Sequence, residues 1–275
     1  MGIKTKDFYN SLLIKEGLSE LTVEGYRRVL SKFFRDVGTK KPKNRDIENY
    51  MVGMHKKGHS YSHIANTSVA LERWMAFIKL PIKLGRPRKP KQIIKTTLTD
   101  GEVARILAAT KNAREKAMIA ILVYSGIRNK ELCSLRVEDL NLDNLHLRVI
   151  GGKGSKDRLV YISRECAKII TEYTSQIKIV GNDYLFHTLQ AGKQYSGWAL
   201  RKLVKTVAIR AGIKKRVYPH LFRHSLACNL LNRGANIMTI QALLGHQDVR
   251  TTLIYAHSTA QRVQQEYNFY CPNYL

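Results

Sequence analysis

Apolar residues recur at helical spacing through the first 80 residues. One run begins at Thr22, which we predict as the N-cap, and ends at Gly38, which stops the helix. A second run begins after Ser60 and Ser62 and ends near Pro81. Together with residues 8–13 and 47–54, these runs predict a bundle of about four helices. The apolar positions of the two long runs are Val23, Tyr26, Leu30, Phe33 and Phe34, and Ile64, Leu71, Trp74, Met75 and Ile78.

The rest of the chain combines helical and alternating patterns. Residues 102–110 and 113–124 have helical spacing, and Gly126 breaks the second helix. Between Leu145 and Ile162, alternating apolar residues flank the segment GGKGSKD, which is typical of a β-hairpin. Helical spacing returns at Trp198 and persists to the end of the chain. The expected fold class is mainly α with a small antiparallel β-sheet.

A basic segment separates the two halves. Residues 83–95 contain six lysines or arginines and no acidic residue, punctuated by Gly85, Pro87 and Pro90. We predict an extended, semi-rigid linker. It could be a solvated tether, but the basic character of the whole chain favours a strap along a phosphate backbone. The expected organisation is a helical domain at 1–82, a linker at 83–96 and a second domain at 97–275.

Composition narrows the class of partner. The 275 residues include 47 Lys plus Arg against 21 Asp plus Glu, a formal charge of +26, and the pI is about 10.0. This excess indicates a polyanionic partner, and nucleic acid is the first candidate. A membrane is disfavoured because no window approaches the roughly 20 apolar residues of a spanning helix. No signal-peptide pattern is present, so we expect a soluble, cytoplasmic protein with reduced, mostly buried cysteines.

The segment from His220 to Tyr255 contains the densest candidate chemistry. On a helix that starts at Pro219, residues three and four apart share a face, so His220, Arg223 and His224 are expected to project toward one point. An arginine fork flanked by imidazoles suits a phosphodiester, and Tyr255 is then a candidate nucleophile. Taken alone, each has an ordinary explanation: a buried histidine, or one of 14 tyrosines that packs in a core.

Two upstream motifs add basic side chains. Arg128 lies in SGIRNKEL, before a helix predicted to begin at Asn129 or Lys130, where it would favour an anion; alone, it is an ordinary surface arginine. Glu131 is either its orienting partner or an exposed charge. Lys153 lies in GGKGSKDR, at a predicted hairpin tip from which it could reach a substrate, although such a segment alone is usually just a flexible turn.

Three other functions are weaker interpretations of these motifs. The glycine-rich segment does not match the phosphate-loop template, so an ATPase is disfavoured. His220 and His224 have the spacing of half a zinc-protease pair, but no glutamate lies between them and Arg223 would repel a metal, so no metal site is expected. Residues 234–255 could form a helix-turn-helix DNA reader, and His246 could simply cap the helix that ends at Gly245.

The order and spacing of the motifs closely resemble the tyrosine recombinase (integrase) family. The resemblance covers residues 97–257 and extends more loosely to the N-terminal half, where LTVEGYRRVLSKFF is similar to the family's core-binding domain. It implies six active-site residues: Arg128 and Arg223 bind the scissile phosphate, His246 bonds a non-bridging oxygen, His220 assists proton transfer, Lys153 protonates the leaving oxygen, and Tyr255 is the nucleophile. Lys156 is a lesser candidate for the role of Lys153, and His224 is assigned to helix packing.

The resemblance also implies an architecture and a reaction. The family's two domains clamp DNA like a C, and the enzymes act as a tetramer on two DNA sites. Cleavage proceeds through a 3′-phosphotyrosyl link with no metal, ATP or other cofactor. The C-terminal tail resembles the Xer-type tail that docks into a neighbouring subunit, although Cys271-Pro272 replaces a frequent His-Pro. We expect a small Xer-like recombinase because no arm-binding domain precedes the first predicted helix.

Two alternatives share these motifs. A type IB topoisomerase uses the same arginine, lysine, histidine and tyrosine chemistry but relaxes DNA as a monomer. The compact linker, the LLGHQD context and the tail favour recombination instead. A non-catalytic DNA-binding protein is disfavoured because all six predicted active-site positions hold the expected residue types. The sequence leaves open the target site and the choice among chromosome dimer resolution, plasmid resolution and mobile-element integration.

Overall fold

A computed structural model describes residues 3–39, 42–85, 96–151, 157–177, 184–188 and 193–245. Its contacts divide the chain into an N-terminal unit and a C-terminal unit, with the boundary between Ile94 and Lys95. Most of the predicted linker, residues 86–95, lies outside the described residues.

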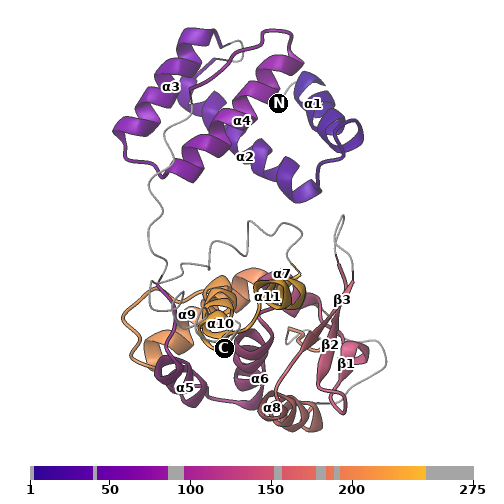
Figure 1. Cartoon of the computed structure of the whole chain (residues 1–275). Helices are drawn as coiled ribbons and strands as arrows, with labels where there is room; N and C mark the ends of the chain where they lie inside the picture. Colours follow the sequence, from indigo (N-terminus) through magenta and orange to yellow (C-terminus); the bar gives the residue numbers. More distant parts are fainter. Residues whose placement is uncertain are drawn as a thin grey trace, which may run out of the picture. The chain divides into compact units, whose positions relative to one another are not determined.

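The N-terminal unit contains the four predicted helices (Figure 1). Aromatic rings fill its core: Phe8 packs edge-on against Trp74 at 5.2 Å between ring centroids, and Phe33 contacts Phe34. Such rings bury large apolar areas and hold four short helices together. The helices are α1 (Ile3–Ile14), α2 (Glu20–Val37), α3 (Asn44–Lys56) and α4 (Tyr61–Phe77).

The start of α2 differs from the sequence prediction. Its N-cap is Ser19, whose hydroxyl accepts a hydrogen bond from the main-chain N–H of Thr22, so the cap predicted at Thr22 is wrong. A serine three residues upstream satisfies an N–H of the first turn, and Thr22 therefore lies within the helix. The predicted stop is confirmed: Gly38 ends α2 in the left-handed conformation.

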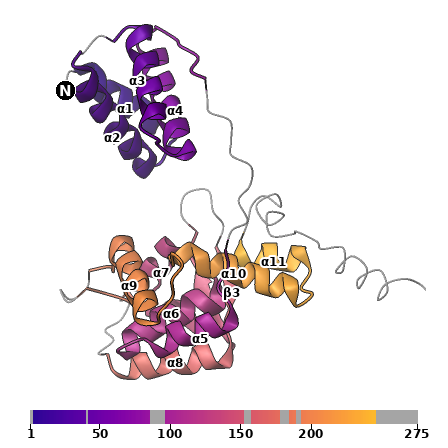
Figure 2. The same cartoon turned by 90° about the vertical axis from the view of Figure 1, so that its left-hand side faces the viewer.

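The C-terminal unit is built around α6 (Ala113–Ser125) (Figure 2). Every side chain of this helix from Ala117 to Leu122 is buried. Helices α5, α7, α8 and α10 and strand β3 all pack against α6. The other elements of this unit are α5 (Asp100–Ala108), α7 (Asn129–Ser134), a 3-10 turn (Val137–Asp139), β1 (Leu140–Asn141), β2 (His146–Val149), β3 (Arg158–Tyr161), α8 (Arg164–Ser175), α9 (Gly197–Arg210), α10 (Pro219–Asn232) and α11 (Ile237–Leu244).

A three-stranded antiparallel sheet confirms the predicted hairpin and adds one strand. The strand order is β1-β2-β3, and Leu147 pairs with Val160 while Val149 pairs with Arg158. Strand β1 and helix α8 are additions to the sequence prediction. Two residues are too few to show alternation, whereas α8 has a recognisable signal, because Ser163 caps it and its buried residues recur at helical spacing. The fold class is mainly α with a small antiparallel sheet, as predicted.

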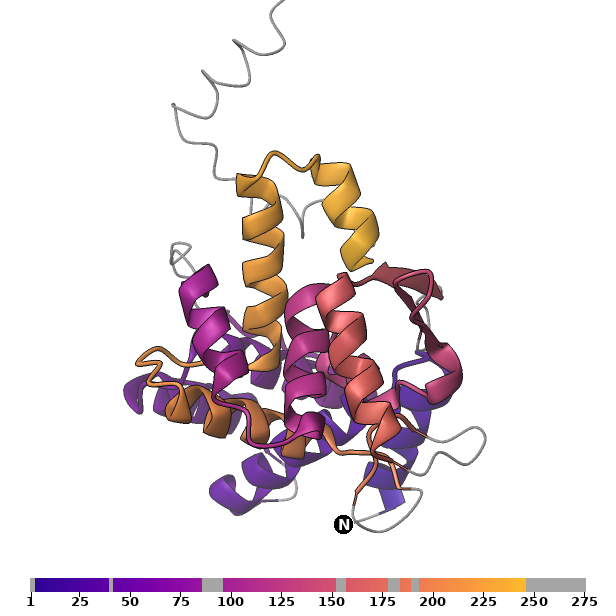
Figure 3. The ribbon, with the colours of Figure 1, turned by 90° about the horizontal axis from the view of Figure 1, so that it is seen from below.

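Helices α10 and α11 are the last two elements of the described part of this unit, which ends at residue 245. They pack against each other, and α11 also contacts β3 (Figure 3). The hydroxyl of Ser225 on α10 accepts a hydrogen bond from the main-chain N–H of Leu98, at 2.8 Å, and donates one to the carbonyl of Leu221. The start of the described C-terminal unit is thereby joined to α10.

Within the described ranges, no helix is long and apolar enough to cross a membrane.

Candidate functional site

Arg128 lies at the start of α7, two residues after the left-handed turn at Gly126. Its side chain is 39% exposed, and its Nη1 donates to Oε1 of Glu131 at 2.7 Å. The main-chain N–H of Arg128 donates to Oε2 of the same carboxylate, also at 2.7 Å. Glu131 is therefore the orienting partner of Arg128, which decides between the two alternatives left open by the sequence.

Arg223 lies on α10 and is almost completely buried, with 1% of its surface exposed. Its Nη1 donates to the carbonyl of Gly126 at 2.9 Å, and its Nη2 donates to the carbonyl of Leu244 at 2.5 Å. These bonds fix the plane of the guanidinium between the end of α6 and the end of α11.

The two predicted phosphate-binding arginines meet at the end of α11. While Arg223 contacts the carbonyl of Leu244, Nη2 of Arg128 donates to the carbonyl of Gly245 at 3.2 Å. Gly245 has a φ of +62°, so it ends α11 in a conformation that glycine adopts without steric cost. The predicted His246 follows directly in the sequence, so both arginines contact the main chain next to it.

A third arginine, Arg158 at the start of β3, joins this group. Its Nη1 and Nη2 donate to the two oxygens of Glu131 at 3.0 and 2.9 Å, and both side chains are 13% exposed. Burial disfavours the charged form of Glu131, but hydrogen bonds from Arg158 and Arg128 outweigh it and lower the pKa of Glu131 to about 2. The carboxylate is therefore charged at neutral pH.

Sequence reasoning missed the contribution of Arg158, although a signal was present. In β3, Arg158 shares the inward side of the strand with the buried Val160. A charged residue at an inward position of a strand predicts a buried ion pair, because an unpaired charge is costly to bury. The partner, Glu131 on α7, could not be identified from spacing alone.

The histidines of α10 differ in their surroundings. Arg223 and His224 are buried, whereas His220, one turn earlier, is exposed. The burial of His224 agrees with its predicted packing role, and its Nδ1 lies 3.9 Å from Sγ of Cys228. His220 is open to solvent on the first turn of the helix, whose predicted start at Pro219 is confirmed.

Four of the named candidates, Lys153, Lys156, His246 and Tyr255, lie outside the described residues. The positions that flank the first two are described. The main-chain N–H of Gly151 donates to Oδ1 of Asp157 at 2.8 Å, and Arg158 follows at once. The described residues on the two sides of this segment, Gly151 and Asp157, are therefore joined to each other, directly before Arg158 in the sequence.

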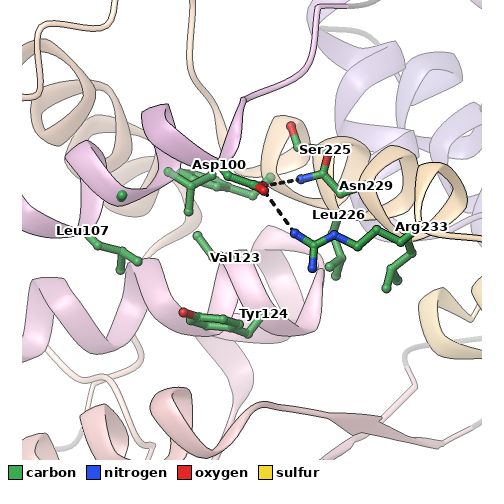
Figure 4. A pocket seen from close by; sticks show the side chains of 12 residues that line it. Asp100, Leu107, Val123, Tyr124, Ser225, Leu226, Asn229 and Arg233 are labelled. Atoms are coloured by element: carbon green, nitrogen blue, oxygen red, sulfur yellow. Dashed lines mark hydrogen bonds and ion pairs between the residues drawn. The ribbon is translucent and has the colours of Figure 1, made fainter.

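A pocket of about 340 Å³ opens elsewhere in the C-terminal unit, between α5, α6 and α10 (Figure 4). Asp100 accepts hydrogen bonds from Asn229 at 3.2 Å and Arg233 at 3.0 Å at its rim, and apolar side chains such as Leu226 line much of it. Of the six predicted active-site residues, the three that the structure describes, Arg128, His220 and Arg223, do not line this pocket. The arrangement around Glu131 is therefore separate from it.

The arrangement around Glu131 has the chemistry of an anion site. The guanidinium groups of Arg128 and Arg158 bind this one carboxylate, and the guanidinium of Arg223 lies at the same end of α11 as that of Arg128, which leaves a surplus of positive charge. Guanidinium groups with fixed planes can bind two oxygens of a phosphate at once. Within the described ranges, no three His, Cys, Asp or Glu side chains gather in a way that could hold a metal ion.

Comparison with known proteins agrees with this chemistry. Residues 96–262 match the model of the phage integrase family. The chain is 34% identical over 255 residues to the tyrosine recombinase XerA of Pyrococcus horikoshii, covering 91% of this chain and 87% of the relative. It is 29% identical to the tyrosine recombinase XerD of Listeria innocua, covering 97% of each chain.

Solved structures give the same result. A crystal structure of XerA recombinase is 30% identical and has a TM-score of 0.58, covering 98% of this chain and all of that one. The XerH site-specific recombinase, in a pre-cleavage complex with its difH substrate, has a TM-score of 0.73 at 22% identity and covers 95% of this chain and 83% of its own, which shows a common fold. The chain belongs to the phage integrase family and is a tyrosine recombinase, an enzyme of site-specific DNA recombination.

Proposed function

We propose that this recombinase cleaves and rejoins duplex DNA through a covalent link between Tyr255 and the 3′ phosphate at the cleavage position. The observation that carries the proposal is the meeting of Arg128 and Arg223 at the carbonyls of Gly245 and Leu244. Two arginines from separate helices contact the main chain immediately before His246. A phosphate bound by Arg128 and Arg223 would therefore lie close to the segment that leads to the nucleophile.

The charge of the site supports phosphoryl transfer. Negative charge grows on the phosphate oxygens as the tyrosine attacks, and fixed donors stabilise it without reorganisation. Arg128 is oriented by Glu131, and the plane of Arg223 is fixed by two main-chain carbonyls. His246, the next residue after Gly245, supplies a further hydrogen bond to a non-bridging oxygen in this proposal.

The proposed proton transfers involve His220 and Lys153. A tyrosine hydroxyl has an ordinary pKa of about 10, so it needs a proton acceptor and nearby positive charge to attack at neutral pH. The Tyr255 oxygen forms a bond to phosphorus as the bond to the 5′ oxygen breaks. His220 assists removal of the phenol proton, and Lys153, or less favourably Lys156, protonates the leaving 5′ oxygen.

Rejoining reverses these steps. The phosphotyrosyl bond keeps the phosphate activated, and attack by a 5′ hydroxyl restores a phosphodiester and frees the tyrosine. The balance needs no ATP. If the attacking hydroxyl comes from a second duplex, the strands are exchanged. The donors that Arg128, Arg223 and His246 provide take the place of a metal in this scheme.

The proposed partner is double-stranded DNA, and the proposed location is the cytoplasm. The formal charge of +26 supports a polyanionic partner, and the related XerH has a structure with its DNA substrate. We further propose a tetramer on two DNA sites, in which the C-terminal tail docks into a neighbouring subunit. The tail, including Cys271-Pro272, lies outside the described residues.

A DNA substrate with a nick beside the cleavage position tests the chemistry, because loss of the short 5′ fragment traps the covalent intermediate. The assay uses a library of candidate sites, including the DNA next to the gene. Wild-type protein should form an adduct with and without EDTA, and Tyr255→Phe should form none. Tyr161→Phe removes the hydroxyl of a tyrosine that is 60% exposed on β3 and should behave as wild type. An adduct with Tyr255→Phe would refute the assigned nucleophile.

A second assay separates recombination from relaxation. A plasmid with two copies of the trapped site should yield recombinant circles. Relaxation of supercoiled DNA without recombinants would favour a type IB topoisomerase activity instead. Specific binding without any adduct would favour the non-catalytic alternative.

A further inference from the structure

Arg158 is a half-buried cation outside the six proposed active-site residues. Its guanidinium forms a two-pronged contact with Glu131, in which each Nη group donates to a different carboxylate oxygen, at 3.0 and 2.9 Å. Such parallel bonds fix the orientation of both groups, which a single contact does not do. Arg158 therefore determines where the carboxylate plane of Glu131 lies.

The same carboxylate also receives two hydrogen bonds from Arg128. One comes from its main-chain N–H and the other from Nη1, each at 2.7 Å. Glu131 thus accepts four hydrogen bonds, two from each arginine. A rotation of its carboxylate would displace the Arg128 guanidinium, because the two are joined by the side-chain bond.

Arg158 also lies directly against Gly245. A Cβ atom placed on Gly245 would be 2.5 Å from Cδ of Arg158 and 2.7 Å from its Nε, far inside van der Waals contact. The carbonyl of Gly245 accepts the other Arg128 bond, from Nη2 at 3.2 Å. Both groups that hold the Arg128 guanidinium therefore touch Arg158.

We propose that Arg158 is a positioning residue for the cleavage reaction, which acts through Glu131 and the Gly245 main chain to hold Arg128 where it binds the scissile phosphate. The proposal rests on the phosphate-binding role proposed above for Arg128. Arg158 itself is covered by these neighbours and makes its contribution without touching the DNA. Its position at the start of β3 also places it at the end of the segment that contains Lys153.

The charge of Glu131 offers a way to distinguish a positioning role of Arg158 in cleavage from a role in stabilising the fold alone. Among the described residues, the charged groups that face this carboxylate are Arg158 on β3 and Arg128 at the start of α7. Burial acts to raise the pKa of Glu131, and hydrogen bonds from Arg158 are the largest influence that lowers it. Without Arg158, the pKa of Glu131 should rise, because burial still disfavours its charged form and the largest opposing influence is gone, and the hold of Glu131 on Arg128 should weaken as the pH falls.

The test compares full-length Arg158→Met and Arg158→Lys with wild type. Arg210→Met is the matched control, because Arg210 on α9 makes a comparable ion pair with Glu115 on α6, at 2.6 Å, and is 21% exposed. Each protein is measured for binding to the nicked substrate, for thermal unfolding, and for the single-turnover rate of adduct formation between pH 5 and 8.

Arg158→Met should bind the substrate as wild type does and cleave it about 10- to 100-fold more slowly, the usual scale for a displaced reactive group. The ratio of the wild-type rate to the variant rate should grow as the pH falls. Arg158→Lys keeps a cation near Glu131 but cannot bridge both oxygens, so its rate should be intermediate. For Arg210→Met, the ratio of the wild-type rate to the variant rate should not depend on pH.

A ratio that stays constant with pH and equals that of Arg210→Met would overturn the proposal. A wild-type rate of adduct formation in Arg158→Lys would also overturn it. If Arg158→Met does not fold, Arg158→Lys alone provides the test. Failure of the proposed function looks different, since wild-type protein itself would then form no adduct. An adduct with wild type and an unaffected rate in both Arg158 variants rejects only the positioning role.

Discussion

Arg223 donates a hydrogen bond from Nη1 to the main-chain carbonyl of Gly126, 2.9 Å away. Gly126 ends α6 in the left-handed conformation, and Arg128 follows two residues later. A substituent at Gly126 would also be crowded, because a Cβ there would lie 3.0 Å from Leu226 and from Leu244. One proposed phosphate ligand therefore supports the turn that presents the other.

Arg223→Lys should show how much the planar guanidinium contributes beyond its positive charge. A lysine can donate to the carbonyl of Gly126 or of Leu244 but has no planar group that reaches both. We expect a loss of about 2 kcal/mol in the free energy of unfolding, because one buried carbonyl loses a charged donor. Adduct formation should fall by about 100-fold or more, the usual effect of removing one fixed donor from a charged transition state.

Urea denaturation and the nicked-substrate assay measure these two effects. The assay is run at a temperature where the variant is fully folded. A wild-type cleavage rate in folded Arg223→Lys would exclude a direct role of the guanidinium at the phosphate and leave Arg223 as a structural residue only.

Local patterns predict the helices better than the site. Periodicity and glycine stops identify most helices, because each depends on a few neighbouring residues. The sequence prediction places the cap of α2 at Thr22, but the cap lies at Ser19. Serine and threonine both accept the capping hydrogen bond, so residue type does not separate the two positions and the backbone conformation decides. The two-residue strand β1 is formed by pairing with β2, which no local pattern reports.

The site depends on contacts between distant segments. Arg128 and Arg223 can be assigned from their motifs, but the carbonyls to which they donate belong to turns whose positions follow from the packing of α6, α10 and α11. The ion pair between Arg158 and Glu131 joins a strand to a helix and has no sequence spacing of its own. An inward charge in β3 indicates that a partner exists without identifying it.

Gly245→Ala should impair both stability and cleavage. The left-handed conformation costs a residue with a Cβ about 1–2 kcal/mol, and the new methyl group would displace Arg158, whose Cδ would be 2.5 Å away. We expect a loss greater than the backbone cost alone, with adduct formation reduced as Arg128 loses its carbonyl contact.

Gly212→Ala is the matched control for that variant. Gly212 has a φ of +67°, and a Cβ placed on it would meet nothing within 4 Å, so this variant reports the backbone cost alone. If the two variants are equally destabilised and Gly245→Ala cleaves at the wild-type rate, the close approach of Arg158 to Gly245 contributes to neither stability nor cleavage.

Glu131→Gln should lower stability in a pH-dependent way. The pKa of Glu131 is lowered from 4.5 to about 2, so its charged form stabilises the folded protein above about pH 4.5, and this contribution is lost as the pH falls through about 2. The shift corresponds to a stabilisation on the order of 3 kcal/mol at neutral pH. The difference in unfolding free energy between wild type and variant should narrow between pH 4.5 and 2.

Denaturation curves across that pH range provide the measurement. Glu172→Gln, on the exposed side of α8, serves as the control for removal of an ordinary surface carboxylate and should change stability by less than about 0.5 kcal/mol. A stability difference for Glu131→Gln that does not change with pH would contradict the assigned role of its charge.

The same substitution at the two histidines of α10 should have different effects, on the cleavage rate at His220 and on stability at His224. His220 is exposed, so His220→Gln should leave the unfolding free energy within about 0.5 kcal/mol of wild type. If His220 assists proton transfer at Tyr255, the rate of adduct formation should fall by about 100-fold.

His224 is buried on the same helix, so His224→Gln should lower stability by about 1–2 kcal/mol through disturbed packing. Thermal unfolding and single-turnover cleavage, measured on both variants, separate the roles, and full activity in His220→Gln would remove that histidine from the mechanism.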